Sequence, residues 1–255
     1  MGKAGIQIYT LRDVANENLP IAIDMIKDAG YQGVEFDAGM LTRAKPDQLK
    51  KLMDEANLAV IGLTLLLPEI SHLLDPMLEY AHITGAEWLV MPWIDEESRK
   101  DLYDYQNIAK VLNDAGRKAA EQGLRFAYHI HGYEFRYFGD QCGFDVLIKE
   151  LDPEFVELQV DTFWVTSGGQ DVLDFSKSYI DRIGSFHLKD AASMDSLTDI
   201  EVGEGILDIQ GIVQLGIKHQ KEWFIVEQEK PTNNLPESIK TSCKNLQKMI
   251  DNNLA

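Results

Sequence analysis

The chain has few residues of several kinds, and each shortage excludes a class of protein. Of its 255 residues only two are cysteine, Cys142 and Cys243, and they lie far apart without the spacing of metal ligands. Zinc-finger and iron–sulfur sites are therefore excluded, and we expect two reduced thiols, with a disulfide left open. Nowhere does the sequence contain the ~18 consecutive apolar residues of a membrane span, so no membrane segment is expected.

Basic residues are also scarce. The 24 lysines and arginines face 42 aspartates and glutamates, which gives a formal net charge of −18. Such an anionic surface repels phosphate backbones and acidic membranes, so we expect neither nucleic acid nor a membrane as a partner. Residues 1–3 run directly into the first strand without an apolar signal, which predicts a cytoplasmic protein, or a periplasmic one if a signal peptide has been removed.

Apolar runs of strand length alternate with segments of helical periodicity along the whole chain, at a spacing of roughly 25–40 residues. Strands are expected at residues 5–9, 33–37, 59–63, 88–91, from 124 into 128–135, 156–161, 183–188 and 223–227. Helices are expected at residues 19–29, 46–55, 74–84, 99–122, 144–150, 172–178, 209–217 and 236–251.

Eight strands that alternate with eight helices predict a single (β/α)₈ TIM barrel over residues 1–255. The strands are apolar rather than alternating, as expected when both faces are buried. An open doubly wound sheet is the alternative, but it would require a glycine-rich nucleotide turn after the first strand. Residues 9–13 contain no glycine, which argues against that fold.

Residues that can bind a metal stand where several predicted strands end. They are Asp37, His129, Asp161, His187 and Glu227. Active sites of TIM barrels lie at these carboxyl ends, so the side chains should gather at one mouth. An open set of about four carboxylate and imidazole ligands suits one catalytic divalent cation, namely Mn²⁺, Mg²⁺, Co²⁺ or Zn²⁺.

The segment 128–135 is the densest part of this pattern. His129 and His131 are two residues apart on one strand and should point the same way, because strand side chains alternate between faces. Gly132 lets the chain turn, and Glu134 can then swing back toward the two imidazoles. This segment predicts at least half of a binding pocket.

Several motifs together resemble those of the sugar phosphate isomerase/epimerase superfamily, which has the xylose isomerase-like barrel. They span nearly the whole chain in order, at residues 7–13, 33–36, 128–135, 161–164, 186–190, 202–205 and 226–227. The resemblance implies one divalent metal at the barrel mouth and substrates that are ketoses, inososes or 3-keto-glycosides.

The resemblance also implies metal ligands, carried over residue by residue to Asp161, His187 and Glu227. Many relatives supply a further glutamate from the fifth strand itself. This chain offers His129 there and Glu134 in the following loop, and we favour Glu134 because it preserves a pair of carboxylates. Many relatives also end the third strand with a histidine, which this chain lacks at residues 62–65 and which argues against a close match to ketose 3-epimerases.

The chemistry implied is proton transfer next to a carbonyl, where the cation neutralises the developing enediolate. Glu227 and Glu134 would flank the substrate as base and acid. Lys189, two residues after His187, would hold a substrate oxygen or assist a leaving group; alternatively it is a buried ion-pair partner of Asp161 or Glu229.

The expected function is a metal-dependent sugar isomerase or epimerase that acts on a ketose or keto-sugar. Its small-molecule sugar would contact Tyr9, Glu35, His129, His131 and Trp164. The alternative is a lyase or dehydratase of the 3-keto-glycoside or inosose type at the same site, and a non-catalytic sugar-binding barrel comes third. Six histidines and the negative charge argue against an endonuclease of the endonuclease IV type. A homo-oligomer is possible.

Overall fold

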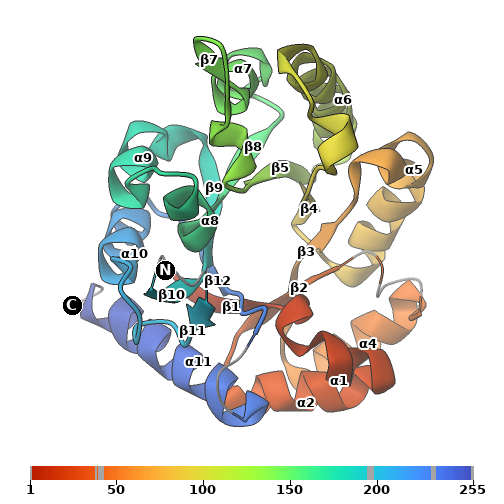
Figure 1. The fold of residues 1–255 in the computed structure, drawn as a ribbon. Helices are drawn as coiled ribbons and strands as arrows, with labels where there is room; N and C mark the ends of the chain where they lie inside the picture. The colour runs from red at the N-terminus through yellow and green to blue at the C-terminus, as the bar shows by residue number, and fades with distance from the viewer. Residues whose placement is uncertain (1, 38, 40–42, 194–197, 231–233, 254–255) are drawn as a thin grey trace.

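The computed structural model describes residues 2–37, 39, 43–193, 198–230 and 234–253. These residues form a closed barrel of parallel strands surrounded by helices (Figure 1). The strands are β1 (Lys3–Gln7), β2 (Gly33–Phe36), β3 (Ala59–Thr64), β4 (Trp88–Met91), β5 (Arg125–Ile130), β8 (Glu157–Asp161), β9 (Ile183–Leu188) and β12 (Trp223–Val226). They follow one another around the barrel in chain order, and β12 closes it against β1. The predicted (β/α)₈ fold is confirmed.

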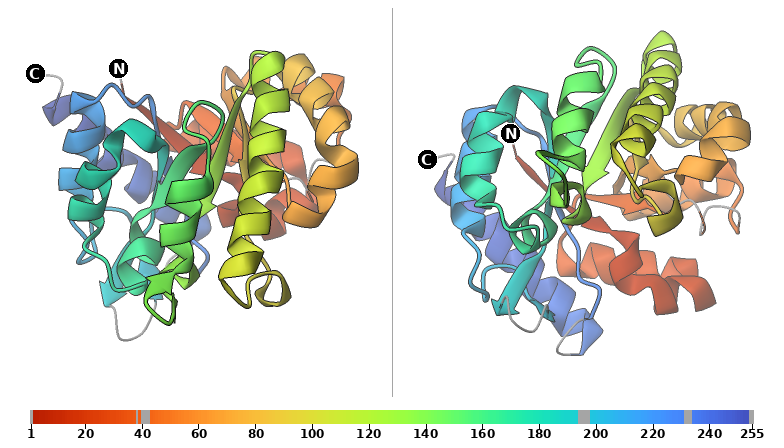
Figure 2. Two further views of the ribbon diagram at one scale, coloured as in Figure 1. Left: turned by 90° about the horizontal axis from the view of Figure 1, so that it is seen from above. Right: turned by 45° about the horizontal axis from the view of Figure 1, so that its top comes forward.

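The outer layer consists mainly of helices that follow the strands (Figure 2). The helices are α2 (Leu19–Ala29), α4 (Pro46–Ala56), α5 (Leu67–Thr84), α6 (Leu102–Glu121), α7 (Gly143–Glu150), α9 (Val172–Ser178), α10 (Ile209–Lys218) and α11 (Leu235–Asn252). Helix α5 begins seven residues earlier than predicted. Pro68 stands in its first turn, where no backbone donor is needed, and Glu69 accepts the N–H of Leu66 at 2.8 Å.

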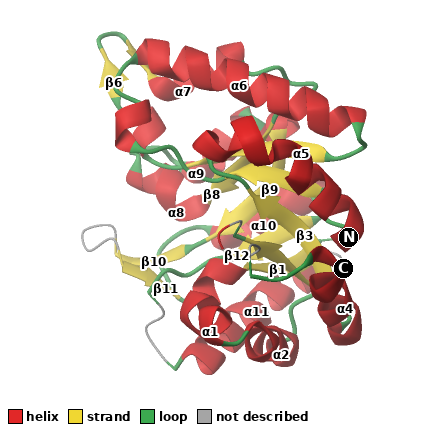
Figure 3. Ribbon diagram, turned by 90° about the vertical axis from the view of Figure 1, so that its right-hand side faces the viewer, coloured by secondary structure: helices red, strands yellow, loops and turns green. Residues whose placement is uncertain are grey.

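The sequence did not predict several short elements near the strand ends. After β1 the chain forms the turn η1 (Ile8–Leu11) and helix α1 (Arg12–Glu17), and after β8 it forms helix α8 (Thr162–Ser167). Two hairpins, β6 (Tyr137–Phe138) with β7 (Gln141–Cys142) and β10 (Asp190–Ser193) with β11 (Thr198–Ile200), complete this end. Figure 3 shows the hairpins at one end of the barrel and both chain termini at the other.

The opposite end of the barrel is filled by apolar side chains. A cluster of Ile61, Trp88, Val90, Ala127, Trp223 and Ile225 occupies the interior, and Trp88 and Trp223 are the first residues of their strands. Gly33 has no side chain because a Cβ there would lie 2.8 Å from the Trp223 ring. The barrel is therefore packed at its amino-terminal end, which leaves the carboxyl ends of the strands to form a pocket.

None of the helices in the described part of the chain is both long enough and apolar enough to cross a membrane.

Candidate active site

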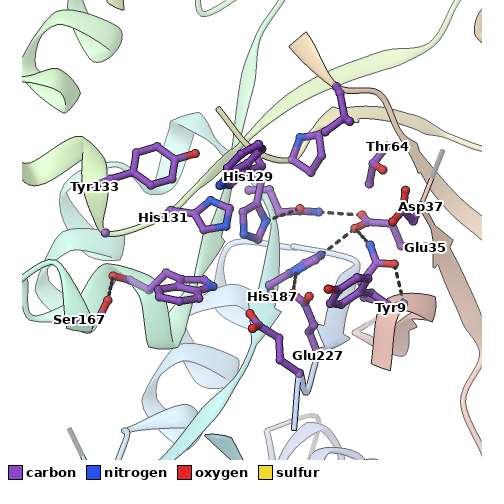
Figure 4. Close-up of a pocket in the computed structure, with 18 residues that line it drawn as sticks. Tyr9, Glu35, Asp37, Thr64, His129, His131, Tyr133, Ser167, His187 and Glu227 are labelled. Atoms are coloured by element: carbon purple, nitrogen blue, oxygen red, sulfur yellow. Dashed lines mark hydrogen bonds and ion pairs between the residues drawn. The ribbon is translucent and has the colours of Figure 1, made fainter. Parts of the chain in front are cut away.

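A cavity of about 650 Å³ opens at the carboxyl ends of the strands (Figure 4). Its lining residues come from every part of the barrel wall. They include Gln7, Tyr9, Glu35, Asp37, Thr64, Leu66, Trp93, His129, His131, Tyr133, Gln159, Trp164, His187, Glu227 and Glu229. The cavity lies where the sequence predicted the site.

Three side chains at the base of this cavity are close enough to share a metal ion. His129, Asp161 and His187 each offer one ligand atom, and these atoms all lie within 4.8 Å of one another. All three residues are buried, and the rings of His129 and His187 are 4.6 Å apart. They extend from β5, from the last residue of β8 and from β9, three neighbouring strands of the barrel.

Gln159 determines which nitrogen of His129 carries the proton. Its amide nitrogen donates to Glu35 Oε2 at 2.8 Å and to Ser185 Oγ at 3.1 Å, so its oxygen is the atom that faces His129 Nδ1, at 2.8 Å. His129 Nδ1 must therefore be the protonated donor. Burial lowers the pKa of His129 to about 3, so the ring is neutral and its Nε2 carries a free lone pair.

The lone pair of His129 Nε2 faces Asp161. Asp161 Oδ1 accepts the N–H of Trp164 at 2.8 Å and so caps helix α8, whereas Oδ2 is buried without a hydrogen-bond partner in the described part of the chain. The distance from His129 Nε2 to Asp161 Oδ2 is 4.0 Å. Burial raises the pKa of Asp161 to about 6, despite the opposing charge of Lys189. Two electron-rich atoms facing each other in a buried site form a pair that a cation would stabilise.

His187 lies between two carboxylates. Its Nε2 is 2.8 Å from Glu35 Oε1, and its Nδ1 is 2.9 Å from Glu227 Oε2. Burial alone would lower the pKa of His187, but Glu35 and Glu227 raise it to about 10. Without a metal, the ring is a protonated imidazolium that neutralises its two partners.

Glu35 is fixed from three sides. The side-chain amide of Gln7 donates to its Oε1 at 2.7 Å, Gln159 donates to its Oε2, and His187 bonds to Oε1. The carboxylate is fully buried. Burial would raise the pKa of Glu35, but the charge and hydrogen bond of His187 lower it below the ordinary value. Glu35 is therefore an ionised residue that orients the imidazoles.

Lys189 is a buried cation surrounded by carboxylates. Its Nζ is 2.7 Å from Glu229 Oε1, 3.7 Å from Glu227 Oε2 and 3.9 Å from Asp161 Oδ2. Burial opposes its charge, but Glu227, Asp161 and Glu229 raise the pKa of Lys189 above the ordinary value. The ion pairs expected with Asp161 and Glu229 are both present.

The donor set fits a divalent cation. A metal site with oriented ligands has imidazole and carboxylate donors and a correctly protonated ring such as that of His129. Here it also has a buried carboxylate oxygen that accepts no hydrogen bond from the described residues. His187 could ligate by exchanging one of its carboxylate partners for the ion, while the other continues to orient the ring. Glu227, beside His187, is the next available oxygen donor.

Glu134 lies apart from this group. It is fully buried in the turn η3 (Tyr133–Phe135), where it accepts hydrogen bonds from the Tyr128 hydroxyl and, at 3.0 Å, from the N–H of His131. Burial raises the pKa of Glu134 to about 7. The turn directs its carboxylate to Tyr128 and away from the lining of the cavity, so on the fifth strand it is His129 that meets Asp161 and His187.

The five residues expected to contact the substrate all line the cavity. His131 stacks on Tyr133 with ring centroids 5.1 Å apart, and it lies 5.5 Å from the Trp164 ring. Its Nδ1 is buried and has no hydrogen-bond partner among the described residues. This side of the cavity therefore combines aromatic surface with one polar atom that a ligand could satisfy.

Sequence reasoning missed the polar residues that support the site. Gln7 and Gln159 line the cavity, and Gln159 makes the hydrogen bond that sets the His129 tautomer. Gln159 precedes Asp161 by two residues on one strand, so both side chains point into the barrel. An amide in an otherwise apolar run was the signal that could have revealed it.

Comparisons with known proteins agree with the barrel fold. Residues 23–249 match the family described as xylose isomerase-like TIM barrel. Over 135 residues the chain is 30% identical to the inosose dehydratase of Geobacillus thermodenitrificans, a match that covers 46% of this chain and 45% of that protein. The chain spans about half the length of the curated relatives it matches.

Solved structures show the same fold at low sequence identity. A sugar phosphate isomerase/epimerase from Parabacteroides distasonis superposes with a TM-score of 0.82 at 19% identity, with 97% of this chain and 94% of that chain covered. The IOLI protein, solved with a bound zinc atom, superposes with a TM-score of 0.77 at 17% identity, with 98% of each chain covered. The family match covers most of the chain, and the barrel and its mouth agree with it, so this protein belongs to the xylose isomerase-like TIM barrel family.

Proposed function

We propose that the protein is a metal-dependent enzyme that removes a proton next to the carbonyl of a polyhydroxylated ketone, and so isomerises or epimerises a sugar. The observation that carries this proposal is the buried pair of His129 Nε2 and Asp161 Oδ2, with His187 beside it. The zinc atom bound by the IOLI protein, which shares the fold, supports a divalent ion in this protein.

In this proposal His129, Asp161 and His187 hold the ion, with Glu227 as a further oxygen donor. When bound, a divalent cation supplies Lewis-acid stabilisation of negative charge on the oxygens of the substrate. Gln159 keeps His129 in the tautomer that ligation requires, and Glu35 keeps the His187 ring in place.

Glu227 is the proposed base. It lines the cavity, and its carboxylate is anchored by His187 at 2.9 Å. Burial would raise the pKa of Glu227, but Lys189 and His187 lower it well below the ordinary value, so the group is ionised. Lys189, whose Nζ is 3.7 Å from Glu227 Oε2 just behind the lining of the cavity, holds that carboxylate in position.

A second candidate function is elimination of a β-oxygen, as in a dehydratase or a keto-glycoside lyase. The sequence predicted Glu134 as the second proton-transfer group, but its carboxylate accepts a hydrogen bond from the Tyr128 hydroxyl and does not line the cavity. Lys189, close to Glu227 and just behind the lining, is then the charge that would stabilise a departing oxygen through the electrostatic field. The relatives named inosose dehydratases, which the chain matches over about half of their length, favour the same outcome.

The test is proton exchange in D₂O. Metal binding would be measured with Mn²⁺. A second sample, loaded with diamagnetic Mg²⁺ so that NMR signals stay sharp, would be incubated separately with D-fructose and with an inosose. The proposal predicts loss of the α-proton signal, followed by an epimeric or aldose product for isomerisation, or by a dehydrated product for elimination. Absence of exchange with both ketones, in protein shown to contain metal, would contradict proton abstraction from these substrates.

A further inference from the structure

We propose that the cavity binds an uncharged sugar or cyclitol that carries an apolar substituent, and that the substituent is covered by Leu66 and Trp93. These two residues are called the rim pair below. This inference rests on the proposed function, because it places the sugar unit at the His129, Asp161 and His187 group. It adds a second subsite and a charge preference.

The rim pair lies across the mouth from His187 and Glu227, and beside the strand that carries His129. Leu66 follows β3 and Trp93 follows β4, and the N–H of Leu65 donates to the carbonyl of Val90 at 2.8 Å, which joins the two segments. In the order of the barrel, β4 is opposite β12, which leads to Glu227, and β3 is opposite β9, which carries His187. A ligand at His187 and Glu227 must therefore extend across the mouth to touch the rim pair.

Both members of the rim pair expose apolar surface to solvent although they line the cavity. Trp93 is 46% exposed and Leu66 is 40% exposed. Large apolar side chains that remain exposed beside a concave polar site mark a surface that a ligand covers. Their exposure within the lining of this cavity identifies the occupant as part of the substrate.

The size of the cavity agrees with a substrate larger than one ring. A volume of about 650 Å³ lies within the range of ~300–1,000 Å³ typical of pockets that bury drug-sized ligands. A lone hexose bound beside His187 and Glu227 would leave the part of the cavity at the rim pair empty. A sugar with an aryl substituent would fill both regions and would remove the exposed faces of Leu66 and Trp93 from water.

The charges that line the cavity disfavour a phosphate or a carboxylate on that substrate. The arginines nearest the lining, Arg12 and Arg99, are held against the rings of Tyr9 and Tyr133, and each donates to a backbone carbonyl. Among the described residues that line the cavity there are four carboxylates, Glu35, Asp37, Glu227 and Glu229, and neither lysine nor arginine. Lys189, just behind the lining, has three carboxylates within 3.9 Å. The residues outside the described part contain no lysine or arginine either, and the whole chain carries −18. An anionic group would find repulsion and no free cation here.

Matched glucosides test the inference without requiring turnover. Binding of methyl β-D-glucopyranoside, phenyl β-D-glucopyranoside and phenyl β-D-glucuronide to the Mn²⁺-loaded protein would be measured by calorimetry. We expect the phenyl glucoside to bind about tenfold or more tightly than the methyl glucoside, because its ring buries apolar surface. The glucuronide, which differs by a carboxylate, should bind at least about tenfold more weakly than the phenyl glucoside.

The variants Trp93→Ser and Leu66→Ser should each reduce the ratio of phenyl to methyl affinity toward one while leaving metal content unchanged. Tyr103→Ser is the matched control, since Tyr103 is 65% exposed on α6 and does not line the cavity. The inference would be overturned if the two glucosides bound equally well, or if neither bound. It would also be overturned by an unchanged affinity ratio in both rim variants, or by a dimer in solution that Trp93→Ser dissociates. Metal content and proton exchange are measured separately, so these results leave the proposed function standing or falling on its own test.

Discussion

The lone pair of His129 Nε2 faces Asp161 Oδ2 across 4.0 Å, and this oxygen has no hydrogen-bond partner among the described residues. Both atoms are acceptors, because Gln159 receives the ring proton at Nδ1 and the second oxygen of Asp161 caps helix α8. A bound cation would convert this unfavourable contact into a pair of ligands. The contact therefore gives a reason for the burial of these two side chains, which lie beside the buried polar residues Gln159 and His187.

The substitution Asp161→Asn should remove metal binding while preserving the fold. Asparagine keeps an oxygen that can accept the Trp164 N–H, so the cap on α8 survives, but an amide group replaces the free carboxylate oxygen. We expect metal affinity to fall by about 100-fold or more, as measured by competition with a chelating dye. The thermal midpoint without metal serves as the control and should fall by no more than a few degrees. Unchanged affinity would remove Asp161 from the ligand set.

The substitution Gln159→Leu tests the role assigned to the amide. Losing the acceptor for His129 Nδ1 frees the ring to adopt the other tautomer or rotate, which should weaken metal binding by about 10-fold to 100-fold. Ser185→Ala is the matched control, because it removes the other hydrogen-bond partner of Gln159 Nε2 and leaves the His129 contact intact. If both variants bind metal equally well, the tautomer argument fails.

The substitution Glu227→Gln should stop proton exchange while metal remains bound. The amide has the same shape and can accept the hydrogen bond from His187 Nδ1, but it cannot take up a proton at neutral pH. We expect exchange of the α-proton in D₂O to fall by at least about 100-fold, followed by NMR. Exchange at the original rate, in a variant with normal metal content, would assign the base to another residue.

Glu134 predicts a pH dependence of stability that is separate from catalysis. Burial raises its folded-state pKa to about 7 from an ordinary 4.5, so the stability it contributes is complete below pH 4.5 and is lost as the pH rises through 7. Glu134→Gln keeps an acceptor for Tyr128 and cannot ionise. The variant should match the wild type near pH 4.5 and exceed its stability by about 1–3 kcal/mol near pH 8, in urea unfolding. A constant difference across this range would contradict the raised pKa.

Much of the fold follows from the sequence because the strands are apolar runs with clear ends. Strand β4 (Trp88–Met91), strand β9 (Ile183–Leu188) and helix α2 (Leu19–Ala29) have the predicted bounds. The first strand was placed too late, because the Gln7 side chain accepts the N–H of Tyr9 and turns the chain into η1. Such local caps compete with an apolar pattern and are not visible in periodicity alone.

The sequence placed the candidate site at the right end of the barrel but did not resolve its inner geometry. Asp161, His187, Glu227 and Lys189 meet as their strand positions predicted. The choice between His129 and Glu134 depended on how residues 132–135 turn, and that turn is set by the bonds of Glu134 to Tyr128 and to the His131 N–H. Strand alternation fixes which side chains share a face, whereas loop direction depends on contacts that form only in the folded chain.

Metal stoichiometry tests the central claim most directly. The purified protein would be stripped with a chelator, loaded with Mn²⁺, passed through a desalting column and assayed by elemental analysis, beside Asp161→Asn and the rim variant Trp93→Ser treated in the same way. The account predicts about one equivalent of metal per chain in the wild type and in Trp93→Ser, and almost none in Asp161→Asn. A wild-type protein that retains no metal, or an Asp161→Asn variant that retains a full equivalent, would contradict it.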